Sequence, residues 1–93
     1  MAATSLEFSK NATNRYEASF VSEGAVVIQV ERAGNGYINV YANLDGMSKT
    51  YIGGYGLYNG GSNLIFSVDV PAGVTVTIES LTEVVSAKML SNG

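Results

Sequence analysis

The side chains that could do chemistry in this chain are carboxylates, because the sequence contains no histidine and no cysteine. Without those two residue types, a serine–histidine triad, a thiol nucleophile and a zinc site with nitrogen or sulfur ligands cannot be built. Hydrolysis of a glycoside by carboxylates alone needs two of them across a cleft, and a small β domain offers little room for a cleft. We therefore expect that the protein is not an enzyme and that none of its eight acidic residues is catalytic. These residues are Glu7, Glu17, Glu23, Glu31, Asp45, Asp69, Glu79 and Glu83.

Calcium is the one metal that these oxygen ligands could suit, since Asp45 and Asp69 lie near predicted turns. No Asp-x-Asp cluster accompanies them, and Asp45 is explained by the turn that it forms with Gly46. Asn11-Ala12-Thr13 matches a glycosylation acceptor, but no signal peptide precedes it. The glycine-rich stretch 53–61 lacks the Gly-Lys-Ser/Thr ending of a phosphate-binding loop. We expect no metal site and no cofactor.

Charge is sparse, at 14% of residues and a net charge of −3, against about 25% charged residues in an average domain. The basic residues are too scattered to neutralise a row of phosphates, so nucleic acid is not an expected partner: Lys10, Arg15, Arg32, Lys49 and Lys88. No stretch approaches the roughly 20 apolar residues of a membrane span, and the first residues do not resemble a signal peptide. We expect a chain that is made and remains in the cytoplasm, with no membrane partner.

The elements that must position any functional side chain are short β-strands, because apolar residues recur with period two between Gly, Asn and Asp turns. With 93 residues, of which 46% are hydrophobic, residues 1–93 form a single domain that needs no disulfide. Asn11 to Asn14 is expected to be a loop whose side chains bond the local backbone. About eight strands are predicted, at 6–9, 16–20, 25–32, 37–44, 47–55, 63–70, 74–81 and 83–90.

Eight short strands at this spacing predict an all-β, two-sheet antiparallel sandwich. We prefer a jelly roll to an immunoglobulin-like Greek key, since the Cys pair and core Trp of the latter are absent; a closed barrel is the third option. Asn35-Gly36 is the strongest hairpin signal, so strands 25–32 and 37–44 are expected to be antiparallel neighbours. Within 37–44, Ile38, Val40, Ala42 and Leu44 are expected to face the core.

The opposite face of that strand carries the main functional signal, an alternation of tyrosine and asparagine. Tyr51 and Tyr55 are four apart and so would share a face in a regular strand, next to Tyr41 across the Asp45-Gly46 turn. Such an amphipathic surface suits a protein interface or a sugar-binding site, and cross-strand tyrosine pairing that only stabilises the sheet is the alternative. The predicted platform consists of Tyr37, Asn39, Tyr41, Asn43, Tyr51, Tyr55 and Tyr58.

Four apolar residues have the wrong parity for the core and would face water in a simple sandwich: Val21, Val27, Ile65 and Val85. Together with the low charge, which leaves sheet edges unguarded, they suggest a subunit that packs against protein partners.

The segments Val26-Val27-Ile28-Gln29-Val30 and 68–74 (Val-Asp-Val-Pro-Ala-Gly-Val) give the chain a resemblance to small tailed-phage virion proteins, the auxiliary or decoration proteins of capsids. That resemblance implies a non-enzymatic virion component, made in the host cytoplasm, whose partners are copies of itself or the major capsid protein. Segment 68–74 is equally similar to sandwich modules that bind carbohydrate, so a glycan partner is the alternative.

Overall fold

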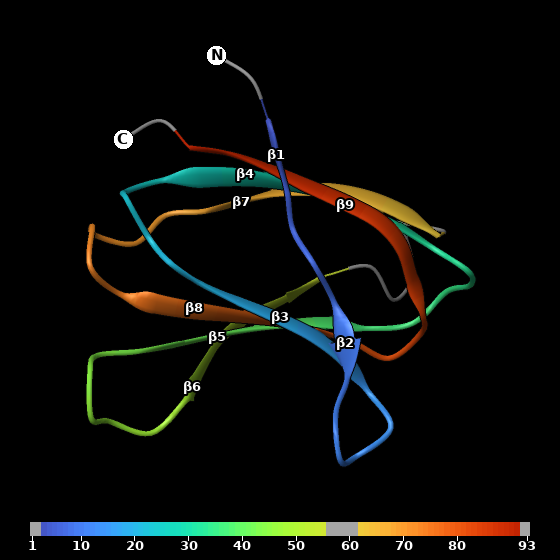
Figure 1. Ribbon diagram of the computed structural model, residues 1–93, viewed down its shortest axis with the longest axis horizontal. Coiled ribbons are helices and arrows are strands. Elements are labelled where there is room, and N and C mark those ends of the chain that lie inside the picture. The colour runs from blue at the N-terminus through green and yellow to red at the C-terminus, as the bar shows by residue number, and fades with distance from the viewer. Residues whose placement is uncertain (1–2, 56–61, 92–93) are drawn as a thin grey trace.

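Two antiparallel β-sheets pack face to face in this protein, and Figure 1 shows them edge-on. The computed structural model describes residues 3–55 and 62–91, among which there is no helix. The four-stranded sheet has the order β1 (Thr4–Ser5), β9 (Val84–Ser91), β4 (Val26–Arg32), β7 (Asn63–Val68). The five-stranded sheet has the order β2 (Ser9–Lys10), β3 (Tyr16–Val21), β8 (Thr75–Ser80), β5 (Ile38–Asn43), β6 (Thr50–Tyr55). The predicted two-sheet antiparallel sandwich is confirmed.

The order of the strands favours one of the two predicted topologies. Among the described strands, only β2–β3 and β5–β6 are consecutive in the chain and also neighbours in a sheet. Every other connection passes from one sheet to the other. In an immunoglobulin-like domain the last two strands pair within one sheet, whereas β8 and β9 lie in different sheets here. The preference for a jelly roll stays a prediction, which this order supports.

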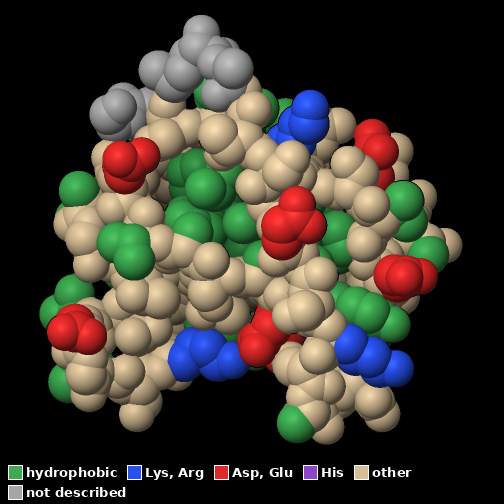
Figure 2. All heavy atoms as spheres, viewed as in Figure 1, with side chains coloured by type: hydrophobic (Ala, Val, Ile, Leu, Met, Phe, Trp, Pro, Cys, Tyr) green, Lys and Arg blue, Asp and Glu red, His purple; other side chains and the backbone are tan. Residues whose placement is uncertain are grey.

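The prediction of a first strand over 6–9 is wrong, because only Ser9 of that range lies in a strand; β1 ends before the range and β2 begins at its last residue. β1 pairs with β9, and β2 pairs with β3, so the chain changes sheets over the segment Leu6 to Phe8. Leu6 is buried, and its backbone N–H donates to the carbonyl oxygen of Ala87 at 3.0 Å. The segment crosses in front of both sheets in Figure 1 and closes this side of the sandwich. Figure 2, which has the same view, shows hydrophobic side chains in the region between the two sheets.

The core is built from alternate residues of each strand, as the period of two predicts. The hydrophobic side chains that are fully buried come from both sheets: Ile28 and Val30 from one, and Ile38, Val40, Val76 and Ile78 from the other. Each contributes about 1.5–3 kcal/mol relative to an exposed side chain. Leu44 was expected to continue this row, but that prediction is wrong, because the side chain is 62% exposed. β5 ends at Asn43, and the predicted Asp45-Gly46 turn begins there, with Gly46 at φ 80°.

The predicted hairpin at 33–36 is also wrong, since β4 and β5 lie in different sheets. A type I′ turn requires positive φ at both central residues, and Asn35 does not have it; only Gly36 does, at 150°. The segment bonds instead to the β8–β9 connection: Ala33 N–H donates to the Glu83 carbonyl at 2.9 Å, and Thr82 Oγ1 donates to the Gly34 carbonyl at 2.9 Å. These bonds hold the segment as a crossover between the sheets.

Arg32, which the sequence suggested only as a scattered charge, is buried at the end of β4 and ties this crossover together. Its Nη1 donates to the Gly36 carbonyl at 2.6 Å, and its Nε donates to the Ser62 carbonyl at 3.0 Å. Desolvation by burial lowers the pKa of the Arg32 guanidinium from its ordinary value. A buried cation is held here because carbonyl oxygens satisfy its donors.

Candidate functional site

The outward side chains of the five-stranded sheet form a polar surface that we call the tyrosine face. Because Ala18, Ile38, Val40, Val76 and Ile78 point into the core, the residues between them point outward. The register brings them into rows across β3, β8 and β5, with Tyr51 of β6 next to Tyr41. The tyrosine face consists of Glu17, Ser19, Val21, Thr75, Thr77, Glu79, Asn39, Tyr41, Asn43 and Tyr51.

Two carboxylates, Glu17 and Glu79, lie directly opposite each other on neighbouring strands of this face. Like charges in that arrangement are destabilising, and neighbouring groups offset the repulsion. Asn11 Nδ2 donates to Glu79 Oε2 at 3.2 Å, and Tyr41 Oη donates to Glu79 Oε1 at 3.4 Å. Lys49 Nζ lies 3.7 Å from Glu17 Oε2. The two carboxylates and Lys49 therefore place charged groups at one end of the tyrosine face.

Hydroxyl groups adjoin the carboxylates in the next row of the face. Ser19 and Thr77 are paired across β3 and β8, and their hydroxyl oxygens lie 2.9 Å apart in a hydrogen bond. Thr77 is buried although it points outward. The face thus offers carboxylate, amide and hydroxyl groups over a small area of sheet.

Two tyrosines bound this polar area on the side of β6. The rings of Tyr41 and Tyr51 meet edge to face, with centroids 6.0 Å apart and an interplanar angle of 72°. Lys49 Nζ lies 4.8 Å from the centroid of the Tyr41 ring. A Cβ added to Gly54 would lie 2.6 Å from the Tyr51 hydroxyl oxygen, so Tyr51 extends over the backbone of Gly54, where no side chain obstructs it. Tyr51 is 57% exposed and presents ring surface to solvent.

Tyr55 does not share this face, and the prediction that it lies beside Tyr51 is wrong. The register of β5 and β6 shifts between Val40, which pairs with Gly53, and Tyr41, which pairs with Tyr51. This β-bulge leaves Ile52 as an extra residue, which reverses the parity of everything after it. Tyr55 consequently points toward the other sheet and stacks on Phe66 with centroids 4.6 Å apart and an interplanar angle of 18°.

The other members of the predicted platform are divided. Asn39 and Asn43 lie on the tyrosine face as expected, in line with Glu79 and Thr75 respectively. Tyr37 is 47% exposed but precedes β5, in the crossover. Tyr58 lies outside the described residues.

The four apolar residues of wrong parity are not gathered in one patch. Val21 lies at the end of β3 on the tyrosine face, whereas Val27, Ile65 and Val85 belong to β4, β7 and β9 of the other sheet. Ile65 and Val85 are 67% and 70% exposed, and Val27 is half-buried.

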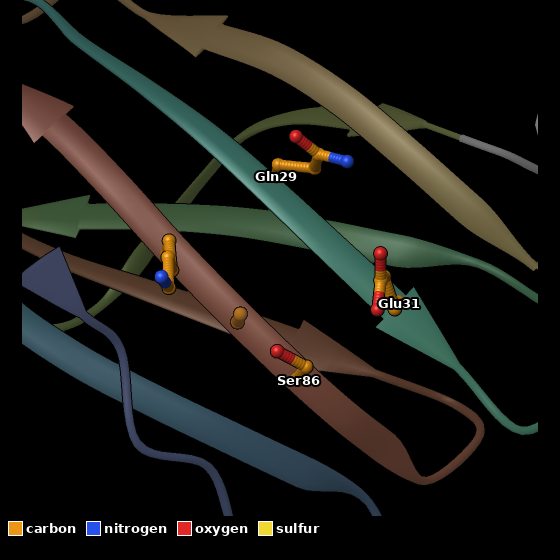
Figure 3. Close-up of a pocket in the computed structure, with 5 residues that line it drawn as sticks. Gln29, Glu31 and Ser86 are labelled. Atoms are coloured by element: carbon orange, nitrogen blue, oxygen red, sulfur yellow. The ribbon is translucent and has the colours of Figure 1, made fainter. Parts of the chain in front are cut away.

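The outer surface of the four-stranded sheet has a shallow polar hollow of about 250 Å³. Gln29 and Glu31 of β4 and Ser86 of β9 line it, as Figure 3 shows. Ala87 and Lys88 of β9 complete the lining. Pockets for drug-sized ligands are typically about 300–1,000 Å³ and enclosed, so this hollow does not suit such a ligand. Among the described residues, no group of three or more Asp and Glu side chains could hold a metal ion, and no helix has the length and apolar character of a membrane span.

Sequence reasoning missed the half of the tyrosine face that β3 and β8 supply, above all Glu17, Glu79, Ser19 and Thr77. The sequence pattern indicates that these residues point outward, since each alternates with a residue that faces the core. It does not indicate that β8 lies between β3 and β5, because β8 is separated from both by long stretches of chain.

A comparison with protein-family models found no match, and a comparison with characterised proteins found none. Among solved structures, the chain is similar to the C-terminal CBM6 of LamC, a marine laminarinase from Zobellia galactanivorans. The identity is 15% and the TM-score is 0.44, over 98% of this chain and 92% of that chain. A likeness of this degree assigns neither a fold nor a function to the present chain.

Proposed function

We propose that this domain binds neutral carbohydrate on the tyrosine face. The observation that carries the proposal is the placement of Tyr51, which is exposed and extends its hydroxyl over Gly54 beside rows of carboxylate, amide and hydroxyl groups. A tyrosine offers an apolar ring with a polar tip, which suits the C–H face of a sugar ring. Carboxylate oxygens such as those of Glu79 accept strong, charge-assisted hydrogen bonds from hydroxyl donors.

The charge of the face selects the class of glycan. Glu17 and Glu79 outnumber Lys49, which forms an ion pair with Glu17 and is the one cation paired with either carboxylate among the described residues. An anionic sugar would be repelled there, while a neutral one supplies the hydroxyl donors that carboxylates and amide oxygens accept. Four neighbouring strands at about 4.8 Å spacing make the face roughly 14 Å wide, which suits several sugar units of an extended chain.

The experiment is electrophoresis of the folded protein through gels that contain soluble neutral polysaccharides (a β-glucan, a xylan or a mannan) or an anionic polygalacturonate. We expect at least one neutral polysaccharide to retard the wild type and polygalacturonate to leave it unaffected. Tyr51→Ala should abolish the retardation. Tyr37→Ala is the matched control, because Tyr37 is similarly exposed but precedes β5 and lies outside the paired rows of carboxylate, amide and hydroxyl groups. The absence of wild-type retardation on every neutral glycan, also on a wider glycan array, would contradict the proposal.

A second candidate function is that of a structural subunit in a protein assembly, such as the virion predicted from the sequence. The observation that favours it is an apolar hollow of about 310 Å³ at the β5–β6 turn, whose lining includes Leu44, Met47 and Val74. Leu44 and Met47 are both more than 60% exposed. Two-sheet sandwiches include both lectin and capsid domains, so the fold does not choose between the two functions.

If the chain is a subunit of a protein assembly, replacing both Leu44 and Met47 by Ser should reduce the amount of the chain that sediments with the assembled particles. The isolated domain should stay folded. Unchanged sedimentation of the double variant would count against it. Retardation on glycan gels should be unaffected by the same double variant, because neither residue belongs to the tyrosine face.

A further inference from the structure

The edges of the two sheets differ in how they are protected against pairing with another chain. An edge strand exposes unpaired N–H and C=O groups, and proteins guard such edges with short strands, charges, prolines or bulges. β1 and β2 have two residues each, and β6 contains the bulge at Ile52. β7, the remaining edge among the described strands, has six residues in an unbroken register with β4, and none is charged or proline.

The direction of the free backbone groups of β7 follows from one hydrogen bond at its start. Arg32 N–H donates to the Ser62 carbonyl at 3.1 Å, so residues 32 and 62 form a hydrogen-bonded pair of the antiparallel ladder. Such pairs alternate with non-hydrogen-bonded pairs. Leu64, Phe66 and Val68 therefore direct their backbone groups to β4, whereas those of Asn63, Ile65 and Ser67 point away from the sheet. The Tyr55 hydroxyl reaches the Ser67 carbonyl at 3.4 Å, which agrees with this assignment.

We propose that this domain self-associates as a two-fold dimer in which β7 pairs antiparallel with β7 of a second copy, centred on Ile65. A two-fold axis at Ile65 places Ile65 opposite itself and Asn63 opposite Ser67 of the second copy. The three residues whose backbone groups point away from β4 then form hydrogen-bonded pairs, with about six bonds in all. In these pairs the Ser67 carbonyl accepts a second hydrogen bond, in addition to the one from the Tyr55 hydroxyl. An isologous interface must be self-complementary, and this edge is.

The side chains fit a second copy of the chain as the occupant. Ile65, which is 67% exposed, would cover its own counterpart, so each copy removes an apolar side chain from water. Asn63 and Ser67 would meet as an amide and a hydroxyl, a pair that can hydrogen bond. A charged edge strand that pairs with its own copy can place like charges opposite each other, which is destabilising. β7 has no charged residue, so this repulsion does not arise.

This dimer is independent of glycan binding, because β7 belongs to the sheet opposite the tyrosine face. Neither Ile65→Lys nor Val85→Lys should alter retardation on glycan gels. The two proposals therefore succeed or fail separately.

The first test measures solution mass by light scattering and sedimentation velocity on the full chain over a hundredfold concentration range. We expect a dimer whose dissociation constant is weakened at least tenfold by Ile65→Lys. Val85→Lys is the matched control, since Val85 has nearly the same exposure and lies in the same sheet but on the interior strand β9; it should leave the dimer intact. A wild type that is monomeric throughout, or equal weakening by both variants, would overturn the proposal.

The second test reads the pairing itself and needs no variant. Amide hydrogen exchange followed by NMR should show protection of the Ile65 and Ser67 N–H groups that rises at least tenfold from dilute to concentrated protein. The Phe66 N–H, which bonds to β4, should be protected at both concentrations. Dimerisation without any change at Ile65 would place the interface elsewhere and refute this pairing.

Discussion

Replacement of Arg32 by methionine tests how the crossover between β4 and β5 is held. The variant keeps the apolar stem but removes donation to the Gly36 and Ser62 carbonyls. The Ser62 carbonyl still accepts a hydrogen bond from the backbone N–H of residue 32. The main loss is therefore the hydrogen bond to the Gly36 carbonyl. Hydrogen bonds from a charged donor are worth about 1.5–3 kcal/mol each. The variant also no longer buries a charged group, whose desolvation lowers the Arg32 pKa, and this offsets part of the lost stability. We expect a net loss of about 2–4 kcal/mol in unfolding free energy.

The assay is urea denaturation, with the melting temperature as a second measurement. Domains of this size have about 5–15 kcal/mol of stability. Each kcal/mol shifts the melting temperature by about 4–8 °C, so the melting temperature should fall by roughly 8–32 °C. Lys88→Met is the control, since it removes an exposed cation from the same sheet and should change stability by less than about 0.5 kcal/mol. If Arg32→Met were no more destabilising than Lys88→Met, the guanidinium would not hold the crossover.

Two further predictions separate structural from surface roles on β6. Tyr55→Ala should cost about 2–4 kcal/mol, because it removes the ring that stacks on Phe66, whereas Tyr51→Ala should cost less than about 1 kcal/mol; equal losses in thermal unfolding would contradict the division made by the bulge. Gly54→Ala should change stability by less than about 1 kcal/mol, since only the flexible end of Tyr51 must move, and should weaken retardation on a neutral glycan gel. Unaltered retardation would show that the position of the ring does not matter.

Most of the strands and most of the core were predictable because one physical requirement governs them. A strand that buries one face must alternate apolar and polar residues, and Val26, Ile28 and Val30 are buried as that alternation predicts. Local side-chain bonding was equally readable. Asn11 Oδ1 accepts from the backbone N–H groups of Thr13 and Arg15, each at 3.0 Å, which forms the predicted loop.

The crossover at 33–36 was not predictable from the same kind of reasoning. Asn-Gly permits a tight hairpin but does not require one, and bonds to residues far along the chain decided the outcome. The carbonyl of Gly34 is taken by Thr82, and that of Gly36 by the buried guanidinium of Arg32. Local preference is a weak constraint whenever tertiary hydrogen bonds and burial compete with it.

The tyrosine face shows how a single extra residue can move side chains from one face of a sheet to the other without any change in composition. Tyr51 and Tyr55 are four apart, which in a regular strand gives them one face, and the bulge at Ile52 places them on opposite faces. The bulge lies beside Gly53 and Gly54, where the lack of side chains lets the backbone kink and lets Tyr51 lie across the strand. One tyrosine therefore closes the sandwich against Phe66 while the other remains exposed on the tyrosine face. The clustering of tyrosines in the sequence predicted an aromatic surface on the sheet. Only the register between β5 and β6 determines which tyrosine rings lie on that surface.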